Sequence, residues 1–290
     1  MARTHTGFVW VVFPWSLWAQ PKGYYYWTEA YTRRHTFLDT IRMEVCEGYP
    51  IIEVGLGDSM KRHKAILSLA SATYLSPELL KNYPHIRTGS PRPPQQHLLA
   101  PANLRITTLM EVQVGGLEFE GVDAFVADEG FAGLLKTCGA DLVLGCNFIS
   151  AAVWAFFPQK GIAIVASRKK SIPFPTRRAW LGRWKGKLWS PFLWQRFSFG
   201  AERVALHPEF SVGQPPALWI EASLYKQLKS KGIWLCEAEG ACRALVSGMK
   251  EPMPVFPAMH LYNALRVVGA HQESILCDFL NRKIYLTEGP

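Results

Sequence analysis

The feature that most limits what this chain can fold into is a series of short strand-like segments in its first half. Each segment either alternates apolar and polar residues or forms a short apolar run bounded by turn residues, which is typical of strands in a barrel or sandwich. A Gly115-Gly116 pair between two of them predicts a tight hairpin. The first half is therefore expected to be a β lobe. The predicted strands are 51–56, 64–69, 105–114, 118–126, 141–148 and 161–166.

Helices are expected to be few and short. Ser76 before Pro77 predicts the N-cap and first position of one helix. In the second half, a strand at 217–220 is expected to lead into a helix at 221–230, with closing strands in 274–285. The proline-rich residues 90–101 are expected to form a surface loop.

Two pairs of segments resemble each other in the same order along the chain. Residues 64–81 are echoed by 216–229, and residues 142–149 are echoed by 274–280. Two related lobes would explain this order. The sequence therefore predicts a mainly β fold with short helices and two unequal lobes. We expect an aromatic N-terminal arm (1–40), a first lobe (41–166), a basic linker (167–200) and a smaller second lobe (201–290).

The N-terminal arm contains an apolar run at residues 7–19 that resembles the core of a signal peptide. The run is too short to span a bilayer, and Pro14 interrupts it. Exposing its tryptophans and tyrosines to water would be unfavourable, so we expect the arm to be retained and buried against a partner. The chain is expected not to span a membrane.

Composition and charge narrow the class of protein. Apolar residues make up 49% of the chain and charged residues 19%, which indicates a globular protein. The 32 basic and 23 acidic residues give a net charge of +9, which favours a polyanionic or acidic partner. None of the six cysteines forms a CxxC pair and the histidines lack metal-ligand spacing, so no metal site or cofactor is expected. Cys236 and Cys242 could close a short disulfide, but we expect reduced thiols in a reducing compartment.

Three segments of the first half follow one another in an informative order. Residues 51–56 form a leading strand, residues 65–79 run from an apolar strand through a turn into Ser76-Pro77, and residues 142–149 read LVLGCNFI. This order resembles the retropepsin-like and pepsin-like aspartic proteases, with their Asp-Thr/Ser-Gly-Ala-Ser turn and Ile-Leu-Gly-x-Asp-Phe-Leu segment. The resemblance implies an aspartic-protease-like β barrel. It covers about residues 45–165 well and 200–290 weakly.

The resemblance places Leu67 at the catalytic aspartate, Ser68 at the Thr/Ser position and Leu69 at the glycine. It also places Asn147 at the aspartate of the later segment, and Glu221 near the corresponding place in the second lobe. Aspartic proteolysis needs two carboxylates that share a proton, and leucine can act as neither acid nor base. We therefore expect an inactive pseudoenzyme without catalytic residues.

Other chemistries have weaker support. Glu221 is more readily explained as a residue in the first turn of a helix, where the helix dipole favours a negative charge. Cys146 is expected to be an inert buried thiol rather than a nucleophile. One alternative stays open, namely an active aspartic-type peptidase whose catalytic residues lie elsewhere.

Residues 142–201 contain no Asp or Glu, and tryptophans and phenylalanines are interleaved with the cations there. Phosphate binding by charge together with aromatic stacking would use this composition, so we expect contact with RNA. An acidic protein surface and lipid headgroups remain alternatives. The candidate RNA-binding residues are Arg168, Lys169, Lys170, Arg177, Arg178, Arg183, Lys185, Lys187 and Arg196.

Together these features predict a non-catalytic structural subunit of a large ribonucleoprotein, specifically a mitochondrial ribosomal protein in the matrix. Its partners would be rRNA and neighbouring proteins, with no small-molecule substrate. The alternative function is an accessory subunit of a mitochondrial membrane complex, such as a respiratory or ATP synthase complex, with the aromatic arm on lipid.

Overall fold

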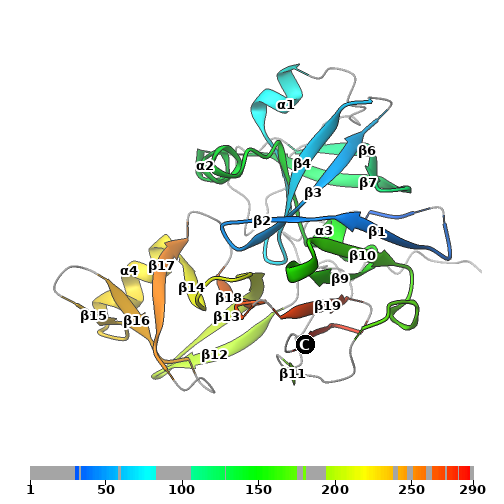
Figure 1. The fold of residues 1–290 in the computed structure, drawn as a ribbon. Helices are drawn as coiled ribbons and strands as arrows, with labels where there is room; N and C mark the ends of the chain where they lie inside the picture. Colours follow the sequence, from blue (N-terminus) through cyan, green and yellow to red (C-terminus); the bar gives the residue numbers. More distant parts are fainter. Residues whose placement is uncertain are drawn as a thin grey trace, which may run out of the picture.

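Two β lobes meet at a six-stranded sheet to which both contribute strands (Figure 1). The computed structural model describes residues 30–32, 34–57, 60–82, 106–127, 129–174, 179–180, 194–237, 241–246, 251–258, 263–271, 273–279 and 281–287. The predicted mainly β, two-lobe fold is confirmed. None of the helices in the described ranges has the length and apolar content that a membrane crossing requires.

The first lobe is a closed barrel. Its strands follow the order β2-β3-β4-β8-β5-β7-β6, and pairing of β3 with β6 closes the last six of these strands into a ring. Along the chain, helix α1 lies between β5 and β6, α2 lies between β7 and β8, and α3 follows β8. The elements are β2 (Glu44–Cys46), β3 (Tyr49–Leu56), β4 (Arg62–Leu67), β5 (Thr73–Leu75), α1 (Pro77–Asn82), β6 (Ile106–Val114), β7 (Leu117–Val126), α2 (Glu129–Cys138), β8 (Leu142–Leu144) and α3 (Cys146–Ile149).

Local sequence signals account for the turns of this lobe. The β6–β7 hairpin turns at Gly115, whose φ of +57° is readily available only to glycine. The hydroxyl of Ser76 accepts a hydrogen bond from the amide of Leu79 at 3.0 Å, which caps α1 as predicted. Leu67, the last residue of β4, is fully buried in the barrel, which confirms the expected burial.

The second lobe is an open half-barrel with strand order β12-β13-β18-β14-β17-β16-β15. Helix α4 follows β14, as the sequence predicted. The elements are β12 (Gln195–Phe199), β13 (Glu202–Phe210), β14 (Ala217–Glu221), α4 (Ala222–Ser230), β15 (Leu235–Cys236), β16 (Cys242–Ala244), β17 (Met253–Ala258) and β18 (Ala264–Val268).

The two lobes repeat one strand arrangement. In the first, β4 runs parallel to β8, while β5 is antiparallel to β8 and parallel to β7. In the second, β13, β18, β14 and β17 have the same relations. The amide of Ser68 donates to the carbonyl of Leu144 at 3.1 Å, and the amide of Ser211 donates to that of Val268 at 2.9 Å. The lobes therefore repeat one topology, although the paired segments that suggested two lobes are not structural counterparts, since β4 corresponds to β13 and β8 to β18.

The shared sheet joins the lobes. Its order is β1-β10-β9-β19-β20-β11, and β9 pairs antiparallel with β19 at the centre. Alternate residues of β9 face opposite sides, so that Trp154 and Phe156 enter the main core while Val153, Ala155 and Phe157 enter a smaller one. The strands are β1 (Leu38–Arg42), β9 (Val153–Phe157), β10 (Ile162–Ala166), β11 (Ala179–Trp180), β19 (Ser274–Asp278) and β20 (Lys283–Thr287).

Several predicted boundaries were wrong. The strand predicted at 141–148 ends at Leu144, because the chain turns at Gly145 into α3. The counterpart of β8 in the second lobe is β18, whereas 274–280 contains β19 of the shared sheet. Strand β1 begins within the expected arm, β12 within the expected linker, and β9 was missed. The loop at 90–101, and residues 1–29 of the arm, lie outside the described residues.

The expectation of six reduced cysteines was also wrong. Cys46 is joined to Cys138, and Cys236 is joined to Cys242, the one pair that spacing had suggested. Cys46 and Cys138 are 92 positions apart, and the fold brings the last residue of β2 beside the last residue of α2. Cys146 and Cys277 lie outside both disulfides and are fully buried.

Candidate functional site at the lobe junction

A serine from the first lobe and a glutamate from the second meet where the lobes touch. Ser68 begins the turn between β4 and β5, and Glu209 lies near the end of β13. The Ser68 hydroxyl donates to Oε2 of Glu209 across 2.5 Å. Only 3% of Ser68 and 4% of Glu209 is exposed, so the pair is enclosed between the lobes.

The first-lobe turn surrounds the Glu209 carboxylate with donors. The Leu69 amide donates to Oε1 at 2.8 Å, and the Ala70 amide donates to Oε2 at 3.3 Å. The amide of Phe210 donates to Oε1 at 2.9 Å. The Ser71 amide donates to the Ser68 hydroxyl at 3.1 Å, which orients that hydroxyl toward the carboxylate. Every oxygen of this group is therefore engaged by backbone or hydroxyl donors.

A β-bulge aims the carboxylate at the first lobe. Glu209 pairs with Arg266, but Phe210 pairs with Val268, so the register shifts between them. Bulges of this kind redirect a side chain while the strand continues. Phe210 still points into the core, where its ring meets that of Phe156 edge-on at 5.2 Å.

Arg266 supports the same region from β18. Its Nε donates to the carbonyl of Phe210 at 2.9 Å, and Nη2 donates to the carbonyl of Glu47 in the first lobe at 2.5 Å. The guanidinium lies 4.6 Å from the ring centroid of Tyr49, within cation–π range. The cation therefore contacts both lobes while lying close to the carboxylate.

Burial dominates the electrostatics of this site. It raises the pKa of Glu209 above its usual range, and the hydrogen bonds from Ser68, Leu69 and Phe210 and the charge of Arg266 offset only part of that rise. Burial, with the nearby Glu209 charge, also raises the pKa of the Tyr49 phenol. The junction therefore disfavours a negative charge, although its geometry provides donors for one.

The residues predicted for the degenerate active site are only partly brought together. Leu67 lies in the barrel core and Leu69 is buried, with its backbone amide on Glu209. Glu221 is elsewhere: it caps α4, accepting from the amides of Ser223 at 2.9 Å and Leu224 at 3.0 Å. The Ser223 hydroxyl and amide lower its pKa. Glu221 therefore has an ordinary structural role at the start of a helix, but as the N-cap residue before α4 rather than in its first turn as expected.

Sequence reasoning missed Glu209. The only local signal was an acidic residue inside an otherwise apolar strand end, between Pro208 and Phe210. An acidic residue in that setting indicates a buried partner but does not say which one, because the donors come from a turn some 140 positions away.

The Asn147 side chain forms a buried hydrogen-bond network beside the Ser68 turn. Its Oδ1 accepts from the amide and hydroxyl of Thr73 at 3.0 and 2.9 Å, and its Nδ2 donates to the carbonyl of Asp123 at 2.8 Å. The Gly145 amide donates to the Thr73 hydroxyl at 3.1 Å. This buried network fixes β5 and α3 beside the turn. Cys146, on α3, is buried as expected.

The described part of the basic segment packs on the protein. Nζ of Lys169 lies 3.5 Å from the ring centroid of Tyr285. The ring centroids of Phe174 and Phe157 are 6.1 Å apart. Arg168 and Lys170 are exposed beside them. Arg196 is exposed on β12, next to Trp194. The remaining predicted RNA-binding residues lie outside the described residues, and they are Arg177, Arg178, Arg183, Lys185 and Lys187.

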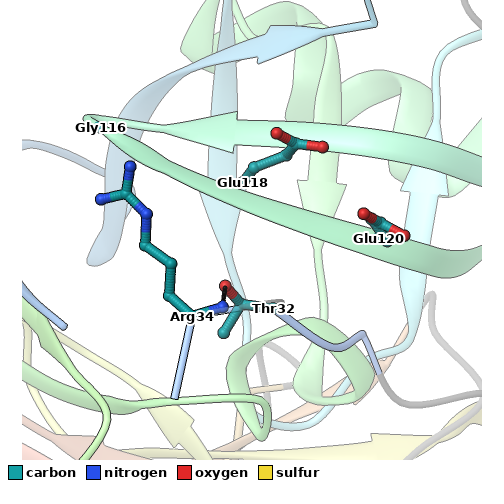
Figure 2. A pocket seen from close by; sticks show the side chains of 5 residues that line it. All are labelled: Thr32, Arg34, Gly116, Glu118 and Glu120. Atoms are coloured by element: carbon teal, nitrogen blue, oxygen red, sulfur yellow. Dashed lines mark hydrogen bonds between the residues drawn. The ribbon is translucent and has the colours of Figure 1, made fainter. Parts of the chain in front are cut away.

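A separate surface hollow lies beside the β6–β7 hairpin. Figure 2 shows Arg34 near Gly116, with the carboxylates of Glu118 and Glu120 further along β7. The hydroxyl of Tyr31 donates to Glu120 at 2.7 Å. None of the lining residues belongs to the Ser68 turn or to β13, so the hollow is distinct from the junction.

Within the described ranges, no three His, Cys, Asp or Glu side chains are grouped closely enough to hold a metal ion. Neither a protein-family model nor a curated protein matches the sequence.

Proposed function

We propose that this protein is a non-catalytic structural subunit built on an aspartic-protease-like fold. In this proposal Ser68 and Glu209 meet at the lobe junction, where the catalytic dyad of these proteases lies between two lobes. The hydrogen-bond pattern makes Ser211, and not Glu209, the counterpart of Ser68 in the second lobe. The observation that carries the proposal is the closed Ser68–Glu209 contact, in which one carboxylate meets a hydroxyl instead of a second carboxylate.

The chemistry of this pair supports the proposal. A carboxylate dyad works because one group is ionised and accepts a proton from water while the other is protonated and donates one. The hydroxyl of Ser68 ionises too weakly to take either role. Glu209 is also held by the Leu69 and Ala70 amides, so an attacking water would have to displace these contacts.

A proteolysis assay tests this proposal directly. We expect no cleavage when the protein is incubated with an unfolded protein substrate at acidic and at neutral pH. Pepstatin-sensitive cleavage that disappears in Glu209→Gln but persists in Glu202→Gln, a change on the same strand outside the junction, would overturn it. That result would establish the alternative of an active peptidase.

Exposed apolar side chains support a role as a subunit. On the second lobe, Leu235, Leu245 and Phe256 are 64%, 56% and 46% exposed. Phe256 pairs with Trp219 on the neighbouring strand, and their rings lie 6.2 Å apart. Apolar side chains gathered on one face are commonly covered by a partner. A neighbouring subunit on this face would remove them from water.

The proposed partner assembly is a ribonucleoprotein such as the mitochondrial ribosome, with rRNA against the basic segment. The absence of acidic residues from 142–201 and the outward-facing Arg168, Lys170 and Arg196 support it. Binding of the full chain to RNA should weaken as salt rises, with a slope of about 0.7–0.9 per phosphate contact. Replacing Arg177, Arg178, Arg183 and Lys187 by Ala should reduce that slope.

The matched control replaces four cations outside the segment, namely Arg42, Lys81, Lys226 and Arg243. Their loss should change the slope much less. If both quadruple variants bind RNA with the same salt dependence, the basic segment has no specific role and the ribonucleoprotein proposal fails.

The two disulfides favour the second candidate, an accessory subunit of a mitochondrial membrane complex. Disulfides persist in oxidising compartments and are rare where thiols are kept reduced, as a matrix location would require. Purification of the native particle separates the candidates: rRNA favours the first, whereas lipid and integral membrane subunits favour the second. Mass spectrometry after thiol alkylation would show whether the disulfides are present.

A further inference from the structure

A hairpin turn of the first lobe docks into the second lobe. The turn consists of Glu47 and Gly48, between β2 and β3. The amide of Val212 donates to the Gly48 carbonyl at 2.9 Å, and Arg266 donates to the Glu47 carbonyl. These contacts run in the same direction, from donors of the second lobe to carbonyls of the first. They are the counterpart of the Glu209 contacts, in which the first lobe provides the donors.

The docked turn has a demanding backbone. Its φ angles are +51° at Glu47 and +77° at Gly48, as a two-residue hairpin of this hand requires. A Cβ at Gly48 would lie 2.8 Å from Nη2 of Arg266, so the fit is tight. The positive φ of Glu47 is unfavourable for residues other than glycine. A turn of this kind keeps its shape when the strands beside it are held firmly.

A disulfide holds one of those strands. Cys46 is the last residue of β2, directly before the turn, and it is bonded to Cys138 at the end of α2. Helix α2 is fixed to the barrel by Leu135, which is buried in the core. Cys46 and Cys138 are both partly exposed, so a small reductant can reach them. The bond therefore links the docking turn to the rigid body of the first lobe.

We propose that the Cys46–Cys138 disulfide is a redox-sensitive clamp on the lobe junction. A dithiol reductant would supply two electrons and two protons, the S–S bond would break to give two cysteine thiols, and the reductant would become a disulfide. The Glu47–Gly48 turn would then lose its anchor, and its contacts with Val212 and Arg266 would loosen. The clamp does not depend on the proposed function, because it concerns only how the lobes are held together.

Hydrogen exchange read at single amides tests the clamp in the full-length chain. The Cys46→Ser/Cys138→Ser variant is compared with Cys236→Ser/Cys242→Ser, which removes the other disulfide at the outer edge of the second lobe. In the first variant, exchange at Val212, Leu69 and Ala70 should be at least about tenfold faster than in the oxidised parent. In the control variant these amides should be unchanged. Treatment of the parent with dithiothreitol should reproduce the first result.

Amides of the shared sheet, such as Ala163 in β10, report on global unfolding. If they accelerate as much as Val212 in the first variant, or if both disulfide variants behave alike, there is no local clamp and the proposal is overturned. Gly48→Ala provides an independent arm, since it disturbs the turn while both disulfides remain. Unchanged exchange at Val212, Leu69 and Ala70 in that variant would also overturn the proposal.

Discussion

The two lobes share a strand order, yet the first closes into a barrel and the second stays open. Strand length explains the difference. In the first lobe, β6 and β7 have 9 and 10 residues and form a long hairpin, of which β6 pairs with β3. In the second, β16 has only 3 residues, and it lies far from β12 in the strand order. Connectivity therefore specifies which strands neighbour one another, while strand length decides whether the sheet closes.

The turns that follow β4 and β13 also differ between the lobes. Ser68 and Ser211 occupy equivalent positions in their lobes, but only the second lobe has a bulge just before its turn. The bulge directs the Glu209 side chain across the junction, where backbone amides of the first lobe donate hydrogen bonds to it. The two similar halves therefore differ at the junction: the second provides a carboxylate, and the first provides its hydrogen-bond donors.

Truncating the core residue before each turn should have the largest effect. Phe210 and Leu67 are equivalent and fully buried. We expect Phe210→Ala to lower the free energy of unfolding by about 3–5 kcal/mol and Leu67→Ala by about 2–5 kcal/mol. Urea denaturation would measure both, with Leu38→Ala on the exposed edge as a control near zero. Separate unfolding of the second lobe in Phe210→Ala would break the view that the shared sheet makes the halves cooperative.

The second-largest loss of stability is expected when alanine replaces the glycine that follows β8 or β18, namely Gly145 or Gly269. A Cβ at Gly145 would lie 2.1 Å from the carbonyl carbon of Ala72, which is backbone and cannot move aside. At Gly269 it would meet the flexible end of Ile275 at 2.7 Å, with φ at +79°. We expect Gly145→Ala to cost about 3 kcal/mol and Gly269→Ala about 1–2 kcal/mol.

The same denaturation series has an internal control in Gly133, on α2, where a Cβ would meet nothing within 4 Å. Gly133→Ala should stabilise the protein by about 0.5–1 kcal/mol because alanine is the better helix former. A larger loss for Gly269 than for Gly145 would contradict the view that the first lobe is the more tightly closed.

Removing the serine hydroxyl at each turn should have a smaller effect. Ser68 donates to a carboxylate, whereas Ser211 donates to the carbonyls of Gln214 at 3.3 Å and Pro215 at 3.2 Å. Hydrogen bonds to ionisable groups are the stronger, so we expect a cost of about 1.5–3 kcal/mol for Ser68→Ala and about 0.5–1.5 kcal/mol for Ser211→Ala. Thermal unfolding at neutral pH would rank them. Equal losses would show that the Glu209 contact adds nothing to the first lobe.

The pH dependence should show the smallest and most specific difference, because among the described residues the buried carboxyl group of the junction, Glu209, belongs to the second lobe. The pKa of Glu209 is higher in the folded protein than in the unfolded chain. Its stabilising contribution is therefore full below the unfolded pKa and is lost as the pH rises through the folded pKa. On acidification from neutral pH, the parent should gain stability relative to Glu209→Gln. Parallel urea curves between pH 7 and 4 would measure this difference, and its opposite sign would contradict the assignment.

Local sequence signals predicted the local structure well. The glycine pair of the β6–β7 hairpin and the Ser76 cap each depend on a few neighbouring residues, and both are present. The junction was harder because its geometry is non-local. The resemblance places Leu67 at the catalytic position; in the structure Leu67 is buried in the barrel core, and its neighbour Ser68 faces the second lobe. Successive residues of an extended chain point to opposite faces, so an offset of one residue exchanges the two.

Glu209 and the Cys46–Cys138 bond could not be located for a related reason. The role of Glu209 arises from a bulge and from donors in the other lobe. Cys46 and Cys138 are 92 positions apart and are neighbours only in the folded chain. A single sequence contains no signal that pairs positions so far apart. The short spacing of Cys236 and Cys242 did suggest their bond, although reduced thiols were expected there too.

The pairing of β9 with β19 also has a consequence for synthesis on the ribosome. The open edge of β9 is complete long before residues 274–278 are made, and translation of the intervening chain takes on the order of ten seconds. During that time the unpaired edge of an apolar strand is available to other nascent chains. We therefore expect a fragment ending at Phe174 to aggregate during translation, and a chaperone that shields strand edges to raise the yield of the full chain. A soluble, monomeric fragment would show that the edge of β9 is protected before β19 has been synthesised.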